Sequence, residues 1–349
     1  MAPLRPDGLR PVSGGTTLSL ERVNRLHVVT GKGGTGKTTV AAALALSLAD
    51  QGRRVLLAEV EGRQGLAQLF DTEPLPYEER KIAIGPGGGE VYGLAVDAEK
   101  ALLDYLQMFY KLGSAGRALK RMGAVDFATT IAPGLRDVLL TGKVCEAVRR
   151  QDRSGRRVYD AVVLDAPPTG RITRFLSVTQ EVAGLARMGP IHHQAQAVTR
   201  VLKSTETAVH LVTLLEEMPV QETVDGVTEL RGADLPVGAV VVNMTRPPLL
   251  DTELLESLDH QPEVPQRELA HALSRAGLGG ARRGQLAERL VEPLVHQARQ
   301  HGRRVRLEVE QRAELSRLGV PLRELPLLGE GVDLAGLYQM ARQLRGQGM

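Results

Sequence analysis

The stretch that decides the fold is Gly31-Lys32-Gly33-Gly34-Thr35-Gly36-Lys37-Thr38-Thr39. An apolar run over residues 26–30 precedes it, and an Ala- and Leu-rich segment over residues 38–49 follows it. Glycines let a backbone turn sharply and aim several N–H groups at one point, and the following helix adds its dipole there. Lys37 supplies a cation for the terminal phosphates, and Thr38 supplies a hydroxyl for Mg²⁺. The stretch therefore predicts a strand–loop–helix unit whose nine loop residues bind ATP with Mg²⁺.

Further apolar runs predict the rest of a parallel sheet. They cover residues 55–60, 91–96, 161–164, 208–213 and 238–242. Each run is bounded by polar or turn residues, as buried parallel strands usually are, and helical patterning fills the segments between them. We expect an α/β fold with a mostly parallel sheet flanked by helices. One domain over residues 23–349 should follow a flexible tail, residues 1–22, and carry a helical subdomain made by insertions near 97–150, 181–205 and 251–318.

The composition is that of a soluble globular chain. It has 349 residues, 42% of them apolar, and a formal net charge of +3. No apolar run approaches 18 residues, and the N-terminal residues lack the apolar stretch of a signal peptide. Together with the single Cys145, these features predict a cytoplasmic protein, either free or peripheral to a membrane through a partner. Arginine pairs occur at Arg149-Arg150, Arg156-Arg157, Arg282-Arg283 and Arg303-Arg304. No aromatic residues interleave these arginine pairs, so the sequence disfavours nucleic acid as a partner.

Lys32 places a second lysine near the start of the loop. The loop therefore resembles the deviant Walker A loop of a group of P-loop NTPases. That group includes the MinD and ParA partitioning ATPases, nitrogenase iron protein, and the arsenite-pump and tail-anchored-protein targeting ATPases. The resemblance implies a lysine that reaches across a dimer interface to the nucleotide of the partner, so Lys32 is a catalytic candidate.

Asp165-Ala166-Pro167-Pro168-Thr169-Gly170 follows the apolar run over residues 161–164. A carboxylate at the end of a strand can hold Mg²⁺ through water, opposite Thr38. Asp165 and Thr38 are therefore the candidate metal-site residues. The segment resembles switch II of the arsenite-pump and targeting ATPase family, with Arg171 where that family commonly has histidine.

Three later segments resemble the same family in the same order. Glu222, within residues 216–223, takes the position of a glutamate near the nucleotide, and Pro326 lies in a loop that packs on the base. Asn243 ends an apolar strand and offers the donor and the acceptor that an adenine edge requires. The chain carries no N-K-x-D guanine motif, so we expect ATP rather than GTP. The resemblance spans about residues 25–345 and is greatest to single-domain actinobacterial members.

The switch I aspartate of this family orients the attacking water. That aspartate lies in a D-P-A motif, and Phe70 matches the phenylalanine at the end of the same family segment. Counting back nine positions from Phe70 places Glu61 at the equivalent position, and Glu59 is the alternative if the register shifts by two. Glutamate is one methylene longer than aspartate, and in-line attack is sensitive to a displacement of about 1 Å. We therefore predict slow intrinsic hydrolysis that depends on a partner to bring Glu61 into line.

The resemblance implies a dimeric switch ATPase, as a homodimer or as a heterodimer with a paralogous ATPase. It would couple subunit closure to a partner, such as a hydrophobic or membrane-protein client. A single cysteine argues against a thiolate site for arsenite, and the absence of a C-x-x-C motif argues against a structural zinc. The alternative is a ParA- or MinD-like partitioning ATPase that binds DNA or a membrane surface. A ligase or kinase on the same loop would need a substrate pocket that the sequence does not reveal.

Overall fold

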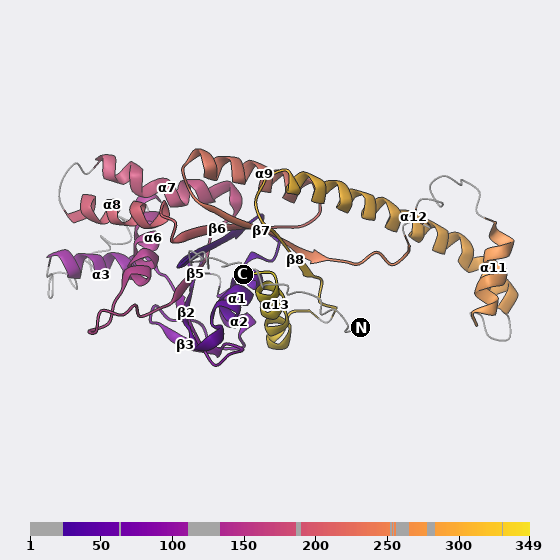
Figure 1. Cartoon of the computed structure of the whole chain (residues 1–349), viewed down its shortest axis with the longest axis horizontal. Coiled ribbons are helices and arrows are strands. Elements are labelled where there is room, and N and C mark those ends of the chain that lie inside the picture. The colour runs from indigo at the N-terminus through magenta and orange to yellow at the C-terminus, as the bar shows by residue number, and fades with distance from the viewer. Residues whose placement is uncertain are drawn as a thin grey trace, which may run out of the picture.

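The computed structural model describes residues 24–62, 64–110, 133–185, 190–251, 253, 255, 265–277, 283–329 and 331–349. The tail predicted over residues 1–22 lies outside the described residues, as do parts of the predicted insertions. Within the described residues the chain forms one sheet with helices on both faces, and a long helix leaves it at one end (Figure 1). This architecture confirms the predicted α/β class.

Eight strands make the sheet, in the order β3-β4-β2-β5-β1-β6-β7-β8. They are β1 (Leu26–Gly31), β2 (Arg54–Glu59), β3 (Arg80–Ile84), β4 (Glu90–Ala95), β5 (Ala161–Asp165), β6 (Thr207–Thr213), β7 (Val237–Thr245) and β8 (Leu322–Pro326). All neighbours pair in parallel except β3, which runs antiparallel to β4. The sequence predicts six of these strands within one to three residues. It misses β3 and β8, because both are largely exposed or half-buried and so carry no apolar run.

Helices connect the strands and cover both faces of the sheet. They are α1 (Lys37–Leu48), the short 3₁₀ helix η1 (Asp50–Gly52), α2 (Gly65–Leu69), α3 (Ala98–Tyr110), α6 (Pro133–Arg149), α7 (Thr169–Leu185), α8 (Pro190–Leu202), α9 (Glu217–Gly232), α11 (Gln266–Arg275), α12 (Arg283–Ser316) and α13 (Leu334–Gly346). The helical insertion predicted near residues 181–205 contains the end of α7 and the whole of α8. No described helix is both long and apolar enough to cross a membrane.

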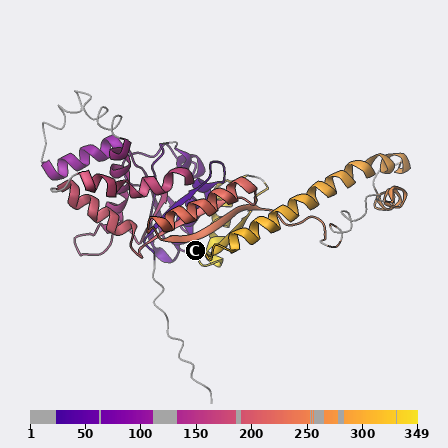
Figure 2. The same cartoon turned by 90° about the horizontal axis from the view of Figure 1, so that it is seen from above.

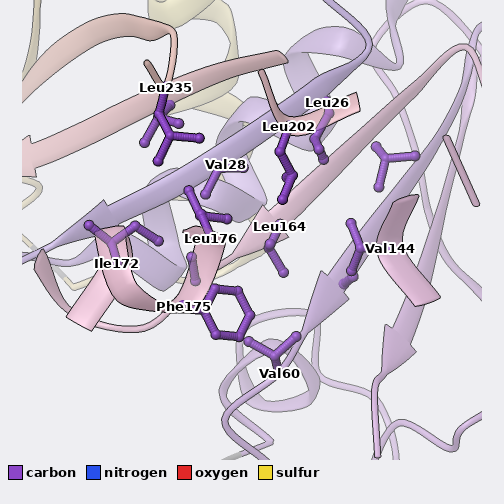
Figure 3. Close-up of a cluster of buried hydrophobic side chains, with 14 of the residues drawn as sticks. Leu26, Val28, Val60, Val144, Leu164, Ile172, Phe175, Leu176, Leu202 and Leu235 are labelled. Atoms are coloured by element: carbon purple, nitrogen blue, oxygen red, sulfur yellow. The ribbon is translucent and has the colours of Figure 1, made fainter. Parts of the chain in front are cut away.

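Each face of the sheet has its own apolar core. Leu26 and Val28 of β1 point to the face covered by α7, where they share a cluster with Phe175 (Figure 3). Val29 lies in the cluster of the opposite face, which contains α1 and α13. Residues around the whole circumference of α1 are buried, because the helix is enclosed between the sheet and α13. The helix that follows the phosphate loop is therefore held firmly from both sides.

A helical arm extends from the β8 side of the sheet (Figure 2). Its main element, α12, has 34 residues and a proline, Pro293, in its outer part. At the outer end α11 packs against it through a small cluster of Ala270, Ala287 and Val291. At the inner end Arg312 forms two hydrogen bonds to the carboxylate of Glu324 in β8, at 2.7 and 3.1 Å. The arm is thus tied to the sheet through its edge strand.

Two stacked histidines join the central strands on the α1 face of the sheet. The Nδ1 atom of His27 lies 3.1 Å from Nε2 of His210, and the rings are nearly parallel. The backbone N–H of Ala239 donates to Nδ1 of His210, and Nε2 of His27 lies 3.2 Å from the carbonyl oxygen of Asn24. One set of tautomers satisfies this series of hydrogen bonds: His210 donates to His27, and His27 donates to Asn24. The series requires both histidine rings to be neutral.

Burial holds both histidine pKa values well below 6.5, at about 4 for His27 and about 3 for His210. Between pH 6.5 and about 4 the unfolded chain therefore binds more protons than the folded one, and stability falls as the pH falls. We expect a loss of about 1.4 kcal/mol per pH unit for each histidine in this window. The measurement is the free energy of unfolding in urea at pH 7.5 and pH 5, compared with a His27→Gln/His210→Gln variant. Equal pH dependence of the two proteins would contradict the prediction.

Candidate nucleotide site

The predicted site residues gather at one edge of the sheet, where the parallel strands have their carboxyl ends. The phosphate loop leaves β1, which lies between β5 and β6. Asp165 ends β5, Glu59 ends β2, and Asn243 lies near the end of β7. Open parallel sheets bind ligands outside this edge, where the strand order reverses. The topology therefore brings together residues as distant in the sequence as Thr35 and Asn243, which are 208 positions apart.

Glycine is required at two positions of the loop for steric reasons. A Cβ atom on Gly31 would lie 2.3 Å from the carbonyl oxygen of Val212 in the neighbouring strand. Gly36 has a φ of 83°, in the left-handed region, and a Cβ there would lie 2.5 Å from Nδ2 of Asn243. Larger residues would push the loop away from β6 and β7. The glycines thus let the loop lie directly on its neighbouring strands.

The middle of the loop is held by hydrogen bonds. Thr35 is buried, and its hydroxyl donates to the carbonyl oxygen of Lys32 at 2.9 Å. The Nδ2 atom of Asn243 donates to the carbonyl oxygen of Thr35 at 2.9 Å, and this contact is buried. Asn243 was predicted to face adenine. One of its amide hydrogens is bonded to the loop, so this side chain also has a structural role that the sequence did not reveal.

The two candidate metal residues are in direct contact. The Oγ1 atom of Thr38 donates to Oδ2 of Asp165 at 2.8 Å. The other oxygen, Oδ1, is buried and has no hydrogen-bond partner among the described residues. Burial raises the pKa of Asp165 to about 7, the Thr38 hydrogen bond and the Lys37 charge act against this, and the Glu59 and Glu61 carboxylates add to it. A cation held near Oδ1 would offset the cost of burying this carboxylate.

Lys32, the second lysine of the loop, forms an ion pair within its own chain. Its Nζ atom lies 2.8 Å from Oε1 of Glu222 in α9, and both side chains are about one-third exposed. Ion pairs at such exposure are weak, commonly below about 1 kcal/mol, so Lys32 can leave Glu222 and pair with another anion. Two residues that the sequence placed near the nucleotide are thus adjacent, although 190 positions separate them.

The two candidate glutamates of switch I have different surroundings. Glu59 is 3% exposed, and its carboxylate accepts the backbone N–H groups of Gln64 at 2.6 Å and Leu66 at 3.2 Å. Glu61 is half-buried, and its charge contributes to raising the pKa of Asp165, so it lies within electrostatic range of the metal-site candidate. The engaged carboxylate of Glu59 favours Glu61 as the group that faces the nucleotide.

The remaining predicted residues lie at the periphery of this edge. Pro326 ends β8 opposite Thr245 and is half-buried, and Thr39 lies in the first turn of α1. Arg171, at the start of α7, lies 3.9 Å from Asp137 of α6, and burial raises the pKa of that carboxyl. This contact between switch II and the neighbouring helix has no sequence signal, because nothing local to either residue pairs them.

Comparisons with known proteins agree with this geometry. A sequence profile of the family described as "Anion-transporting ATPase" matches residues 24–205. The chain is 53% identical over 325 residues to "ATPase BagA" from Mycobacterium tuberculosis, covering 93% of this chain and 94% of that protein. It is 24% identical over 262 residues to "Putative arsenical pump-driving ATPase 2" from Aquifex aeolicus, covering 67% and 84%. It is 26% identical over 261 residues to "ATPase GET3" from Kluyveromyces lactis, covering 65% and 74%.

The chain belongs to the anion-transporting ATPase family. The resemblance drawn from its phosphate loop and switch II is therefore confirmed, and the protein is an ATPase. The family match ends at residue 205, before β6, α9 and the helical arm. Lys32 and Asp165 lie inside the match, whereas Glu222, Asn243 and Pro326 lie beyond it.

An Asn243→Asp variant should bind ATP at least about tenfold more weakly. The two side chains have nearly the same shape, but aspartate would set a carboxylate against the Thr35 carbonyl oxygen instead of a donor. Calorimetric titration with ATP measures the effect, and tripolyphosphate, which has no base, serves as the control ligand. Weakened binding of both ligands is expected from a distorted loop. Loss of ATP binding with unchanged tripolyphosphate binding would show that Asn243 acts on the base instead.

Proposed function

We propose that the protein is a Mg²⁺-dependent ATPase switch in which two subunits close on nucleotide and thereby control a partner. The observation that carries the proposal is the ion pair between Lys32 and Glu222. A lysine held loosely in its own chain, on the exposed side of the phosphate loop, is available to another subunit. Its positive charge would then stabilise the charge that develops on the terminal phosphate of that subunit's ATP.

The residues present fit a magnesium ion at the phosphate loop. Oxygen ligands are what Mg²⁺ prefers, and it retains waters and substrate phosphates as further ligands. Thr38 and Asp165 offer such oxygens side by side, and the buried Oδ1 atom of Asp165 has no hydrogen-bond partner. These two residues would hold the ion, Thr38 directly and Asp165 through water. A bound Mg²⁺ neutralises phosphate charge and thus favours displacement at the terminal phosphorus.

The nucleotide ligands are proposed to be the nine residues of the loop, with Lys37 on the terminal phosphates. Lys37 is 8% exposed and close enough to Asp165 to lower the pKa of that carboxyl. Glu61 would orient the attacking water, and its extra methylene relative to aspartate is the reason we expect slow turnover. Pro326 and Asn243 would border the base, and Glu222 would lie near the nucleotide once its ion pair opens.

The partner is proposed to act through the helices beside switch II. Arg171 follows the 165–170 segment directly and contacts Asp137, so a shift of switch II would be transmitted to α6. Helices α3, α6, α7 and α8 lie together on the side of the molecule opposite the arm (Figure 1). A hydrophobic or membrane-protein client is the partner class we propose for them. The second subunit would be another copy of this chain or a paralogous ATPase.

A partitioning ATPase that binds DNA is the second candidate, and the arginine pairs do not favour it. Arg150 is bound to both Glu79 and Glu146, at 2.6 Å each. Arg304 is paired with Glu308 at 3.2 Å. Arginines neutralised within the chain offer less charge for releasing counterions from DNA. Steeply salt-dependent DNA binding by the ATP-bound protein would nevertheless revive this candidate.

A Lys32→Ala variant should keep its affinity for ATP within about threefold and lose at least about a hundredfold in turnover, because Lys32 would act only in the transition state. A Lys37→Ala variant should fail to bind ATP, because the terminal phosphates lose their cation. ATP affinity and turnover are measured for each variant alone. Wild-type ATP affinity in Lys37→Ala would contradict the site itself.

Mixing the two variants tests action between subunits. A Lys37→Ala subunit still carries Lys32 and can supply it to the nucleotide of a Lys32→Ala subunit. We expect the mixture to recover turnover, and the specific activity of the parent to rise with protein concentration. Activity that is independent of concentration down to dilute monomer, with no recovery on mixing, would refute the dimeric switch. Recovery that requires an added paralogue would identify a heterodimer.

A further inference from the structure

Glu59 is a buried carboxylate next to another carboxylate. It ends β2, where its Cα is paired with that of Asp165 at the end of β5. Glu59 is 3% exposed and Asp165 is 7% exposed. Two acidic side chains on adjacent strand ends repel each other and lose hydration, so each needs compensating contacts. Glu59 obtains them from the backbone of the loop that follows it.

The compensating contacts close a small loop. One oxygen of Glu59 accepts the N–H of Gln64 and the other accepts the N–H of Leu66. Hydrogen bonds to a charged acceptor are shorter and stronger than neutral ones, and the 2.6 Å contact to Gln64 fits that class. The strand end and residues 64–66 are therefore clamped together, and they bracket a loop in which the described residues are 60–62. Glu61 lies within it.

The far side of this loop is fixed as well. Gln64 has a φ of 55°, and its side chain both donates to and accepts from the backbone of Leu75, at 3.3 and 2.7 Å. The next residue, Gly65, is so close to Thr38 that a Cβ atom on it would lie 3.3 Å from the Thr38 methyl group. The loop is thus placed against the first turn of α1, beside the candidate metal site.

We propose that Glu59 is a positioning residue, which fixes the backbone of the loop so that Glu61 faces the attacking water. Glu59 does not touch substrate in this arrangement, because both of its oxygens are occupied and its side chain is almost fully enclosed. The inference rests on the water-orienting role proposed for Glu61. Beyond that role, it says that the side chain of Glu59 determines where the Glu61 carboxylate lies and affects hydrolysis only through Glu61.

The test variant is Glu59→Gln, which preserves size but replaces one acceptor oxygen with a donor. That donor would face a backbone N–H, so one of the two hydrogen bonds is lost. We expect turnover to fall about tenfold while ATP affinity stays within about threefold, because a displacement of about 1 Å at the reacting groups can cost up to about a hundredfold. Hydrogen exchange of the peptide covering residues 60–70 should become faster, which reports the loop directly and independently of hydrolysis.

A double-mutant cycle with Glu61→Gln separates positioning from direct action. Single-turnover hydrolysis is measured for the parent, for each single variant and for Glu59→Gln/Glu61→Gln. We expect Glu61→Gln to bind ATP but hydrolyse it very slowly, and Glu59→Gln to have no further effect in that background. A further decrease in the double variant would mean that Glu59 acts on the reaction itself, which overturns the inference.

Asp333→Asn is the control, because it makes the same chemical change at a carboxylate that accepts a backbone N–H, from Gly336 at 2.8 Å, in the cap of a helix that is not part of the 60–70 segment. Asparagine and aspartate cap helices about equally well, so this variant should keep its stability, its turnover and the exchange rate of the 60–70 peptide. Parental turnover in Glu59→Gln, with hydrolysis blocked in Glu61→Gln, would overturn the role of Glu59 alone. Parental turnover in Glu61→Gln would instead overturn the proposed role of Glu61, and the inference with it.

Discussion

The buried carboxylate of Asp165 is the constraint around which the site is built. It ends the strand next to the phosphate loop, has one oxygen on Thr38 and leaves the other without a hydrogen-bond partner. Its pKa is raised by burial because the charged form is costly there. The neighbouring strand end carries Glu59, which is satisfied by the backbone of its own loop. Two acidic side chains thus lie together at this edge of the sheet. The backbone compensates the charge of Glu59, whereas Asp165 has an uncompensated oxygen, and a cation with phosphates would lie beside it.

The sequence predicted those parts of the site whose chemistry is local. The glycines, Lys37 and Thr38 of the loop act within nine consecutive residues, so their spacing alone identified them. The contact between Thr38 and Asp165 followed from topology, because the carboxyl ends of adjacent parallel strands meet. The fold class followed in the same way from buried strands alternating with helices. Strands β3 and β8 escaped prediction because their exposed edges need no apolar run.

The contacts that the sequence could not reveal join residues far apart in the chain. Asn243 and Thr35 are separated by 208 positions, and their hydrogen bond depends on the pairing of β7 with β6 and of β6 with β1. The same is true of the pair formed by Lys32 and Glu222. The Glu59 clamp was hidden for another reason. Counting positions in switch I presents Glu59 and Glu61 as alternatives for one role, whereas their different burial is the basis of the separate roles proposed for them.

The arm gives the molecule a mechanical property that its compact parts lack. Helix α12 has 34 residues, which at 1.5 Å per residue makes it about 50 Å long. Its root is fastened to β8 by Arg312 and Glu324, and β8 ends at Pro326 on the nucleotide edge of the sheet. A straight lever of about 50 Å that tilts by about 5° at its root moves its tip by about 4 Å. Small adjustments of the edge strand, too slight to disturb the packing of the sheet, would therefore reach α11 as displacements the size of a side chain.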